Sequence, residues 1–386
     1  MSPDREVDIL LIGGGVASVR CARTLRRRKF AGSILLVGDE ATLPYNRPPL
    51  SKELLRGEVD LELVAAEPAS WYDRQRVDLL TDAPVASLDP DARLATLADG
   101  TRVRFAQCLL ATGAAPRRPP IPGAEHARLL RTLADARALR AAAVPGGQAL
   151  IVGGGFIGVE AAASLASLGM RVTVLEMAPA LWGGVLGPDL SAWAAEVLRG
   201  VGVRVRLGVR VTALDAGGAW IGDERLPADM LLAGVGVAPR AELAVAAGLA
   251  VDDGVVTDER HRTSAPGIFA AGDVARVAGR RVEHWHAARE GGEASALAML
   301  DEPPPEPRAA WVFSEFAGAS LDVVGWAPAW DDAVPLLDGR VTAYVVEGRV
   351  AQMAIVGSAV SVDDARALVV HRRSLEDVER LGRVDA

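Results

Sequence analysis

The sequence predicts an α/β protein with two Rossmann-like, three-layer domains and a small α+β domain at the carboxyl end. Two glycine fingerprints, at 13–18 and 153–158, each follow an apolar strand and open a helix. The strand after each helix ends in an acid. Beyond a proline-rich run at 301–307, which cannot continue a helix, four short strands and a polar helix are expected.

The first fingerprint follows an expected buried strand at 7–12. Its glycines let the backbone turn tightly, so that helix amide groups point at a pyrophosphate. The third small position is a serine, which still allows close packing of helix on strand. The next strand, 33–37, ends in two acids, which can accept hydrogen bonds from ribose hydroxyls. The expected dinucleotide contacts are Gly13, Gly15, Ser18, Asp39 and Glu40.

The second fingerprint lies between an expected strand at 149–152 and another at 171–175. No arginine that could hold a 2′-phosphate follows its acid, so NADH is favoured over NADPH. A further apolar strand is expected at 230–237, ending in Gly-x-Gly-x-x-Pro. Glycine turns also occur as plain packing solutions, but that interpretation requires two coincidences. The expected contacts here are Gly153, Gly155, Ile157, Gly158, Glu176 and Gly236.

Composition excludes several classes of function. The 386 residues are enough for two or three domains, and 50% of them are hydrophobic, as in a globular protein. The net charge of −8 argues against a nucleic-acid partner. Residues 1–7 lack the apolar core of a secretory signal, and no apolar run approaches membrane-spanning length. We therefore expect a cytoplasmic protein with no membrane partner.

Neither cysteines nor histidines form a pattern typical of a redox dithiol or a metal site. Cys21 and Cys108 are 87 residues apart, so both are expected to be buried packing residues. A protein that holds two dinucleotides usually passes electrons between them, and in this chain those electrons should not pass to a local disulfide. His284 and His286 lack a third ligand at plausible spacing, so no metal is expected, and the start of a helix expected at 285–299 explains them better.

Four segments beside the fingerprints carry a family resemblance. They are 43–52 (Leu-Pro-Tyr-Asn-Arg-Pro-Pro-Leu-Ser-Lys), the Ala-Thr-Gly turn at 111–113, the Arg-Thr-Leu-Ala-Asp segment at 131–135 and the Ala-Gly-Asp at 271–273. Together they resemble the FAD-dependent NADH:ferredoxin reductases of the putidaredoxin and rubredoxin type, with apoptosis-inducing-factor-like proteins as relatives. In this family the Pro-Pro-Leu-Ser-Lys element replaces the Cys-containing helix of the disulfide reductases.

The resemblance implies a domain organisation. A discontinuous FAD-binding domain would comprise residues 1–116 and 240–302. An NAD-binding domain would span 117–239, and a C-terminal α+β domain would span 303–386. The first fingerprint would then hold FAD and the second NADH.

The resemblance also implies further FAD contacts. Arg47 and Lys52 would lie by the FAD, with Lys52 close to the flavin edge. Asp273 would bond the ribityl chain, and the segment 283–285 would meet the pyrimidine end of the isoalloxazine. The other implied contacts are Val85 on the adenine side, the turn residues Ala111, Thr112 and Gly113, Arg131 near the phosphates or ribityl chain, Gly272 and Trp285.

Lys52 and Glu160 are the expected catalytic pair. Lys52 is one of only two lysines among 42 basic residues. The family pairs this lysine with a glutamate of the second fingerprint helix, which is Glu160 here. Such a pair would hold a cation where it stabilises negative charge on reduced flavin. The alternative is that the two are unrelated surface residues.

The implied activity is hydride transfer from NADH to FAD, followed by electron transfer to a ferredoxin-type iron–sulfur protein. One departure bears on the acceptor, because ferredoxin-specific members usually carry Trp-Ser-Asp-Gln where this chain has Phe-Ser-Glu-Phe at 313–316. Two alternatives stay open: an NADH-dependent flavoenzyme that reduces a small molecule or dioxygen directly, and an apoptosis-inducing-factor-like redox-sensing interaction protein. A monomer or homodimer is expected.

Overall fold

The computed structural model describes residues 4–183 and 185–381. Its contacts divide the chain into two compact units. Unit 1 comprises Met1–Arg47, Asp60–Ala115 and Val237–Glu306; unit 2 comprises Pro48–Val59, Pro116–Gly236 and Pro307–Ala386. The three-domain division stays a prediction, and its outermost residues, 1–3 and 382–386, lie outside the described residues.

Unit 1 is built on a seven-stranded sheet in the order β3-β2-β1-β6-β5-β4, with β17 also paired to β6. Strands β1, β2, β3, β6 and β17 run parallel, and β4 and β5 extend the sheet as an antiparallel hairpin. Leu10 and Leu11 of β1 are both fully buried, because layers cover both faces of a parallel sheet. The bounds are β1 Arg5–Ile12, β2 Ile34–Val37, β3 Val77–Leu80, β4 Val85–Asp89, β5 Leu94–Leu97, β6 Arg102–Leu110 and β17 Ile268–Ala270.

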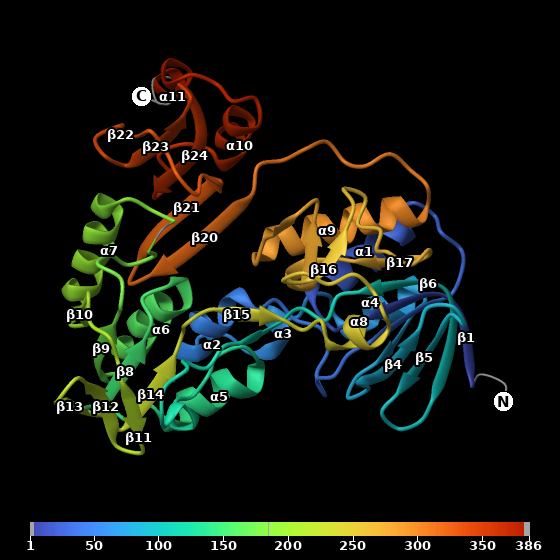
Figure 1. Ribbon diagram of the computed structural model, residues 1–386, viewed down its shortest axis with the longest axis horizontal. Helices are drawn as coiled ribbons and strands as arrows, with labels where there is room; N and C mark the ends of the chain where they lie inside the picture. Colours follow the sequence, from blue (N-terminus) through green and yellow to red (C-terminus); the bar gives the residue numbers. More distant parts are fainter. Residues whose placement is uncertain (1–3, 184, 382–386) are drawn as a thin grey trace. The chain divides into compact units, whose positions relative to one another are not determined.

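Helices α1 (Val16–Arg27) and α9 (Trp285–Met299) lie side by side against one face of this sheet (Figure 1). They approach closely because Gly292 has no side chain: a Cβ there would lie 2.2 Å from the carbonyl oxygen of Ala17. The sequence predicted α9 with these bounds. The other elements are α3 Leu61–Val64, α4 Ala69–Gln75, β7 Ala114–Pro116, β15 Val237–Pro239, α8 Glu242–Ala246, β16 Val255–Thr257, η3 Gly272–Val274, β18 Ala275–Val277 and β19 Arg280–Arg281.

Unit 2 contains a parallel sheet in the order β10-β9-β8-β14 and an antiparallel sheet β11-β12-β13. The strand predicted at 230–237 ends earlier, at Ala233, because Gly234 follows and Gly236 has a φ of +94°. The bounds are η1 Pro48–Ser51, α2 Glu53–Arg56, η2 Ala124–His126, α5 Leu133–Ala142, β8 Gln148–Val152, α6 Phe156–Ser167, β9 Arg171–Leu175, α7 Pro188–Gly200, β10 Arg204–Arg206, β11 Ala213–Asp215, β12 Gly218–Ile221, β13 Glu224–Pro227 and β14 Met230–Ala233.

The carboxyl-terminal part of unit 2 is an antiparallel sheet in the order β20-β21-β24-β23-β22, with helix α10 packed on β21 and β24. Five strands form where four were predicted, because β22 was not recognised. The polar helix that was predicted is two helices. The bounds are β20 Trp311–Phe316, β21 Ala319–Gly325, β22 Asp332–Leu336, β23 Val341–Val346, β24 Arg349–Val356, α10 Val362–Val370 and α11 Leu375–Leu381. Within 4–183 and 185–381, no helix is long and apolar enough to cross a membrane.

Candidate functional site

The first fingerprint forms a tight turn between β1 and α1. Gly13 has a φ of +116°, and a Cβ there would lie 2.2 Å from the carbonyl oxygen of Ala111. The turn at 111–113 therefore lies directly against the fingerprint. Gly15 caps α1, and a Cβ on Gly15 would meet nothing within 4 Å. The amino end of α1 is thus open, as a pyrophosphate requires, while Ser18 is buried on the first turn.

The acids after β2 line a small pocket together with Gly14 and Tyr45. Asp39 forms an ion pair of 2.7 Å with Arg240. Glu40 accepts hydrogen bonds from the Tyr45 hydroxyl at 2.6 Å and from Arg47 at 2.9 Å.

Three other predicted contacts of unit 1 are not among the residues that line this pocket. Val85, the first residue of β4, is half-buried against the core rather than among the residues that line the pocket. Thr112 donates a hydrogen bond to the carbonyl oxygen of Arg240, and the neighbouring Gly113 has a φ of +73°. Arg240 thus connects the 111–113 turn to the acid after β2.

The second fingerprint forms the same kind of turn between β8 and α6. Gly153 has a φ of +110°, and a Cβ there would lie 2.4 Å from the carbonyl oxygen of Gly234. A Cβ on Gly158 would lie 2.1 Å from the carbonyl oxygen of Gly153, so this position has room only for glycine. Gly155 caps α6, and Ile157 beside it is 43% exposed. A Cβ on Gly155 would meet only the carbonyl oxygen of Gly234, 3.9 Å away, so the amino end of α6 is also open.

Glu176 lies at the end of β9 and faces the second turn. Its carboxylate accepts hydrogen bonds from the backbone amides of Gly154 at 2.5 Å and Ala178 at 2.7 Å. Charge-assisted bonds of this kind are strong and fix the carboxylate at the edge of the turn. Gly236 has room for a side chain but adopts a left-handed backbone.

The structure brings the predicted catalytic pair together. Lys52 Nζ lies 3.2 Å from Glu160 Oε1, and only 4% and 3% of the two residues are exposed. The alternative that they are unrelated surface residues is wrong. A buried ion pair is stable only when its remaining polar atoms are also hydrogen-bonded, because taking charges out of water costs several kcal/mol.

Two serines supply those hydrogen bonds. Ser314 of β20 donates to Glu160 Oε1 at 2.8 Å, and Ser51 donates to Glu160 Oε2. The Lys52 ammonium lies 5.1 Å from the ring centre of Phe313, a cation–π contact. Sequence reasoning did not predict that these two serines bond to Glu160. Ser51 directly precedes Lys52, and Ser314 lies in the segment that departs from the family pattern.

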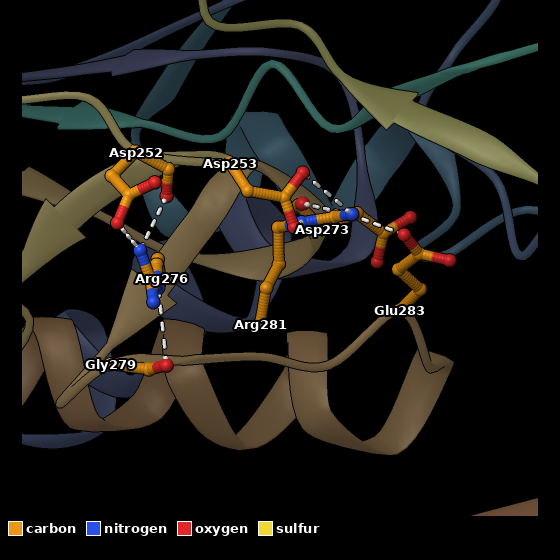
Figure 2. Close-up of polar contacts among 7 residues, drawn as sticks. All are labelled: Asp252, Asp253, Asp273, Arg276, Gly279, Arg281 and Glu283. Atoms are coloured by element: carbon orange, nitrogen blue, oxygen red, sulfur yellow. Dashed lines mark hydrogen bonds and ion pairs between the residues drawn. The ribbon is translucent and has the colours of Figure 1, made fainter.

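Asp273 and Glu283 meet around a second cation, the partly buried Arg281, which Figure 2 shows. Arg281 Nε and Nη2 approach the two carboxylate oxygens of Asp253 at 3.2 and 3.3 Å. Its Nη1 contacts the backbone carbonyl oxygen of Asp273 at 3.5 Å and the carboxylate of Glu283. Sequence reasoning missed Arg281, and no motif distinguishes it from the other arginines.

The start of α9 is polar and half-buried. Burial lowers the pKa of His284 to about 4, partly offset by the charge of Asp273, so this imidazole is neutral at neutral pH. Trp285 donates from its indole to Asn46 Oδ1 at 3.0 Å, and the Arg289 guanidinium lies 4.6 Å from its ring centre. The predicted helix start at the two histidines is present.

Arg131 precedes α5. The Asp135 carboxylate accepts from the backbone amides of Arg131 and Thr132 at 3.0 and 2.8 Å, closing a capping box. This fixes the backbone at the position for which the resemblance implied a cofactor contact.

Both cysteines are fully buried and free, Cys21 in α1 and Cys108 in β6. Burial raises the pKa of each thiol, so neither is a reactive thiolate at neutral pH. In the part of the chain that the structure describes, no group of three or more His, Cys, Asp or Glu side chains could hold a metal ion.

Two open helix ends with glycine turns define the protein as an oxidoreductase of the kind that uses a flavin and a pyridine nucleotide. The family model for pyridine nucleotide-disulphide oxidoreductases matches residues 7–292. The chain therefore belongs to the pyridine nucleotide-disulphide oxidoreductase family.

Relatives within the family narrow the kind. The probable ferredoxin reductase CtmF of Castellaniella defragrans is 34% identical over 395 residues, covering 97% of this chain and 96% of that protein. The biphenyl dioxygenase system ferredoxin–NAD(+) reductase component of Paraburkholderia xenovorans is 38% identical over 82% of this chain and 80% of that protein. The putidaredoxin reductase in its covalent complex with putidaredoxin superposes with a TM-score of 0.90 at 30% identity, covering 96% and 94%.

These findings confirm the predicted family, fold class and enzyme class, and the FAD and NAD(H) cofactors. They confirm a function of the NAD(H)-dependent ferredoxin reductase kind. The glycine turns of this structure fit that assignment, because each leaves the amino end of a twelve-residue helix free for a pyrophosphate.

Proposed function

We propose that this chain accepts electrons from NADH bound at the second glycine turn and delivers them, through FAD bound at the first, to a ferredoxin-type iron–sulfur protein. NADH supplies a hydride, and FAD accepts it and can release electrons one at a time. The observation that carries the proposal is the pair of open nucleotide turns in a chain whose two thiols are both buried. Electrons then have a route between two nucleotides with no disulfide in it.

We propose distinct tasks for the residues of the site. The first turn holds FAD through Gly13, Gly15 and Ser18, and the second holds NADH through Gly153, Gly155 and Gly158. Lys52 provides a fixed cation whose position is set by Glu160, Ser51 and Ser314. The remaining proposed contacts are Asp39, Glu40, Arg47, Val85, Ala111, Thr112, Gly113, Arg131, Ile157, Glu176, Gly236, Gly272, Asp273 and Trp285.

NADH is the proposed donor because Glu176 stands at the end of β9 with its carboxylate held by two backbone amides. A fixed acid accepts hydrogen bonds from a ribose and repels a 2′-phosphate. A cytoplasmic location and a monomeric or homodimeric state complete the proposal.

The test is reduction followed by reoxidation in a stopped-flow instrument. NADH added without oxygen should bleach the visible band of the bound flavin, whereas NADPH should do so much more slowly. The reduced protein is then mixed with dioxygen or with a panel of ferredoxins. Faster reoxidation by a ferredoxin than by dioxygen supports the proposal, and failure of NADH to bleach the flavin contradicts it.

One observation favours direct reduction of dioxygen or a small molecule as a second candidate. Phe316, where the family pattern has a polar residue, is 2% exposed and packs edge-on against Trp182 and Trp193, with ring centres 5.9 and 5.7 Å away. The side chain therefore belongs to an internal aromatic cluster rather than to a polar surface. Reoxidation by dioxygen at a rate that no ferredoxin exceeds would favour this candidate.

A further inference from the structure

Arg281 connects three separate segments of unit 1. It lies on β19, and its side chain is only 10% exposed. The guanidinium meets the Asp253 carboxylate in the turn before β16, the backbone carbonyl of Asp273 in η3 and the Glu283 carboxylate just before α9 (Figure 2). A planar guanidinium suits this task, because its donors point in fixed directions to several acceptors.

The surrounding backbone is shaped to this side chain. Gly254 has a φ of +125°, and a Cβ on it would lie 2.7 Å from the carbonyl oxygen of Val274 and 3.0 Å from Arg281 Cδ. The turn at 252–254 therefore closes on the stem of Arg281 and on η3 together. This packing holds Asp253 where its carboxylate meets the guanidinium along both oxygens.

Charge makes the arrangement depend on one residue. Asp253 and Glu283 share Arg281 as a cation, with Glu283 also close to the start of α9. Without that cation the two partly exposed carboxylates would lose the group that joins them. The segment 283–285 would then move relative to Asp273.

We propose that Arg281 is a positioning residue for FAD, which sets the backbone of Asp273 and the segment 283–285 in the arrangement that the flavin binds. The inference rests on the proposed function, because the resemblance assigns the flavin contacts to Asp273 and to 283–285. Arg281 acts through these residues. It lowers the cost of binding because the segments are already ordered before the cofactor arrives.

The test compares Arg281→Gln with Arg276→Gln. Arg276 is a matched control, because it lies on the partner strand of the same hairpin and pairs with Asp252 and the carbonyl oxygen of Gly279. In Figure 2 the dashed lines from Arg276 lead to these two residues, whereas those from Arg281 lead to Asp253, Asp273 and Glu283. Apoprotein is titrated with FAD, and the absorption spectrum of the bound flavin and the KM for NADH are measured.

Arg281→Gln should raise the Kd for FAD about tenfold and alter the shape of the flavin band, whereas Arg276→Gln should stay within about twofold of the parent protein. Arg281→Lys should recover part of the affinity, because one cation is restored without the planar fork. The KM for NADH should change by less than about twofold, since the proposed NADH turn lies in unit 2.

If Arg281→Gln does not fold, Asp253→Asn is the second variant. It keeps the cation and removes one anchor, with an expected rise in the Kd for FAD of about threefold. Equal FAD affinity and spectra in the Arg281→Gln and Arg276→Gln proteins, or no change in Asp253→Asn, would overturn the inference. Failure of the unmodified chain to bind FAD would instead overturn the proposed function.

Discussion

The acids that follow the two fingerprints are held in different ways. In the first, the side chain of Arg240 pairs with Asp39 from 201 positions along the chain. Glu40 is held by two nearby side chains, those of Tyr45 and Arg47. In the second, Glu176 is fixed by two backbone amides, that of Gly154 in the glycine turn 22 positions earlier and that of Ala178 two positions later. The acids of the first site are therefore held by side chains, and the acid of the second is held by backbone amides.

The two fingerprints also differ at their third small residue. Gly158 has no room for a side chain beside the Gly153 carbonyl, whereas Ser18 is accommodated and fully buried. The second turn therefore has room only for glycine at this position, whereas the first accommodates a serine.

The largest expected effect comes from the same substitution made at the first glycine of each fingerprint. Gly13→Ala and Gly153→Ala each place a Cβ within 2.4 Å of a carbonyl oxygen at a positive φ, which should cost roughly 3 kcal/mol. Gly13→Ala should lose FAD, and Gly153→Ala should keep FAD but not be reduced by NADH. Flavin content and anaerobic bleaching measure the two effects. Loss of FAD from both variants alike would show that the turns are not independent.

The stability of unit 1 should decrease by up to about 3 kcal/mol as the pH is lowered, because of His284. The folded-state pKa of His284 is about 4, against an ordinary value of 6.5. The unfolded chain therefore takes up a proton as the pH falls below 6.5, while the folded chain takes it up only near 4. Stability from this group is full above 6.5 and is lost between 6.5 and 4.

Thermal unfolding and flavin release should be followed across that pH range. The buried His261, whose pKa burial also lowers, lies in the same unit and acts in the same direction. His284→Gln cannot titrate and should reduce the acid sensitivity. An unchanged slope of stability against pH in this variant would contradict the assignment.

Glu176→Gln should have a smaller effect, confined to NADH. The amide side chain keeps one acceptor for the two backbone donors at Gly154 and Ala178 but loses the charge. We expect the KM for NADH to rise about tenfold, or roughly 1.4 kcal/mol, with flavin content unchanged. A matched Asp39→Asn variant should show the converse, with weaker FAD and an unchanged KM for NADH. Equal effects of both variants on NADH would remove the distinction between the sites.

Ser18→Ala should give the smallest effect. Within the described residues the Ser18 hydroxyl is buried without a hydrogen-bond partner. Its removal should leave the free energy of unfolding unchanged or raise it by about 1 kcal/mol. Chemical denaturation measures this. A loss of stability above that size would mean that the hydroxyl is bonded when FAD is present, which repeating the measurement with and without FAD would reveal.

Local patterns allowed much of the fold to be predicted. Strand β9 and helix α9 have the predicted bounds, because apolar runs and their flanking residues determine both locally. Strand β22 was missed because it is an edge strand containing Pro335, and it is defined by its pairing with β23 rather than by its own residues. Such pairing depends on the partner strand, which no local window contains.

The site was predictable only in part for the same reason. Lys52 and Glu160 came from the family pattern, and their contact is present. The hydroxyl of Ser314 reaches Glu160 across 154 positions of sequence, and Arg281 reaches Asp253 across 28. These residues are recruited by topology, so a serine or an arginine carries no sign of its partner until the chain is folded.

Because both native thiols are buried, the folded chain should react only slowly with maleimides. A cysteine introduced at an exposed position such as Val201, which is 44% accessible, would be the one group that reacts quickly. A probe attached there would report on unit 2 during turnover without removing either native cysteine. Slow additional labelling would report how often the core of unit 1 opens, since Cys21 and Cys108 lie on both sides of its sheet.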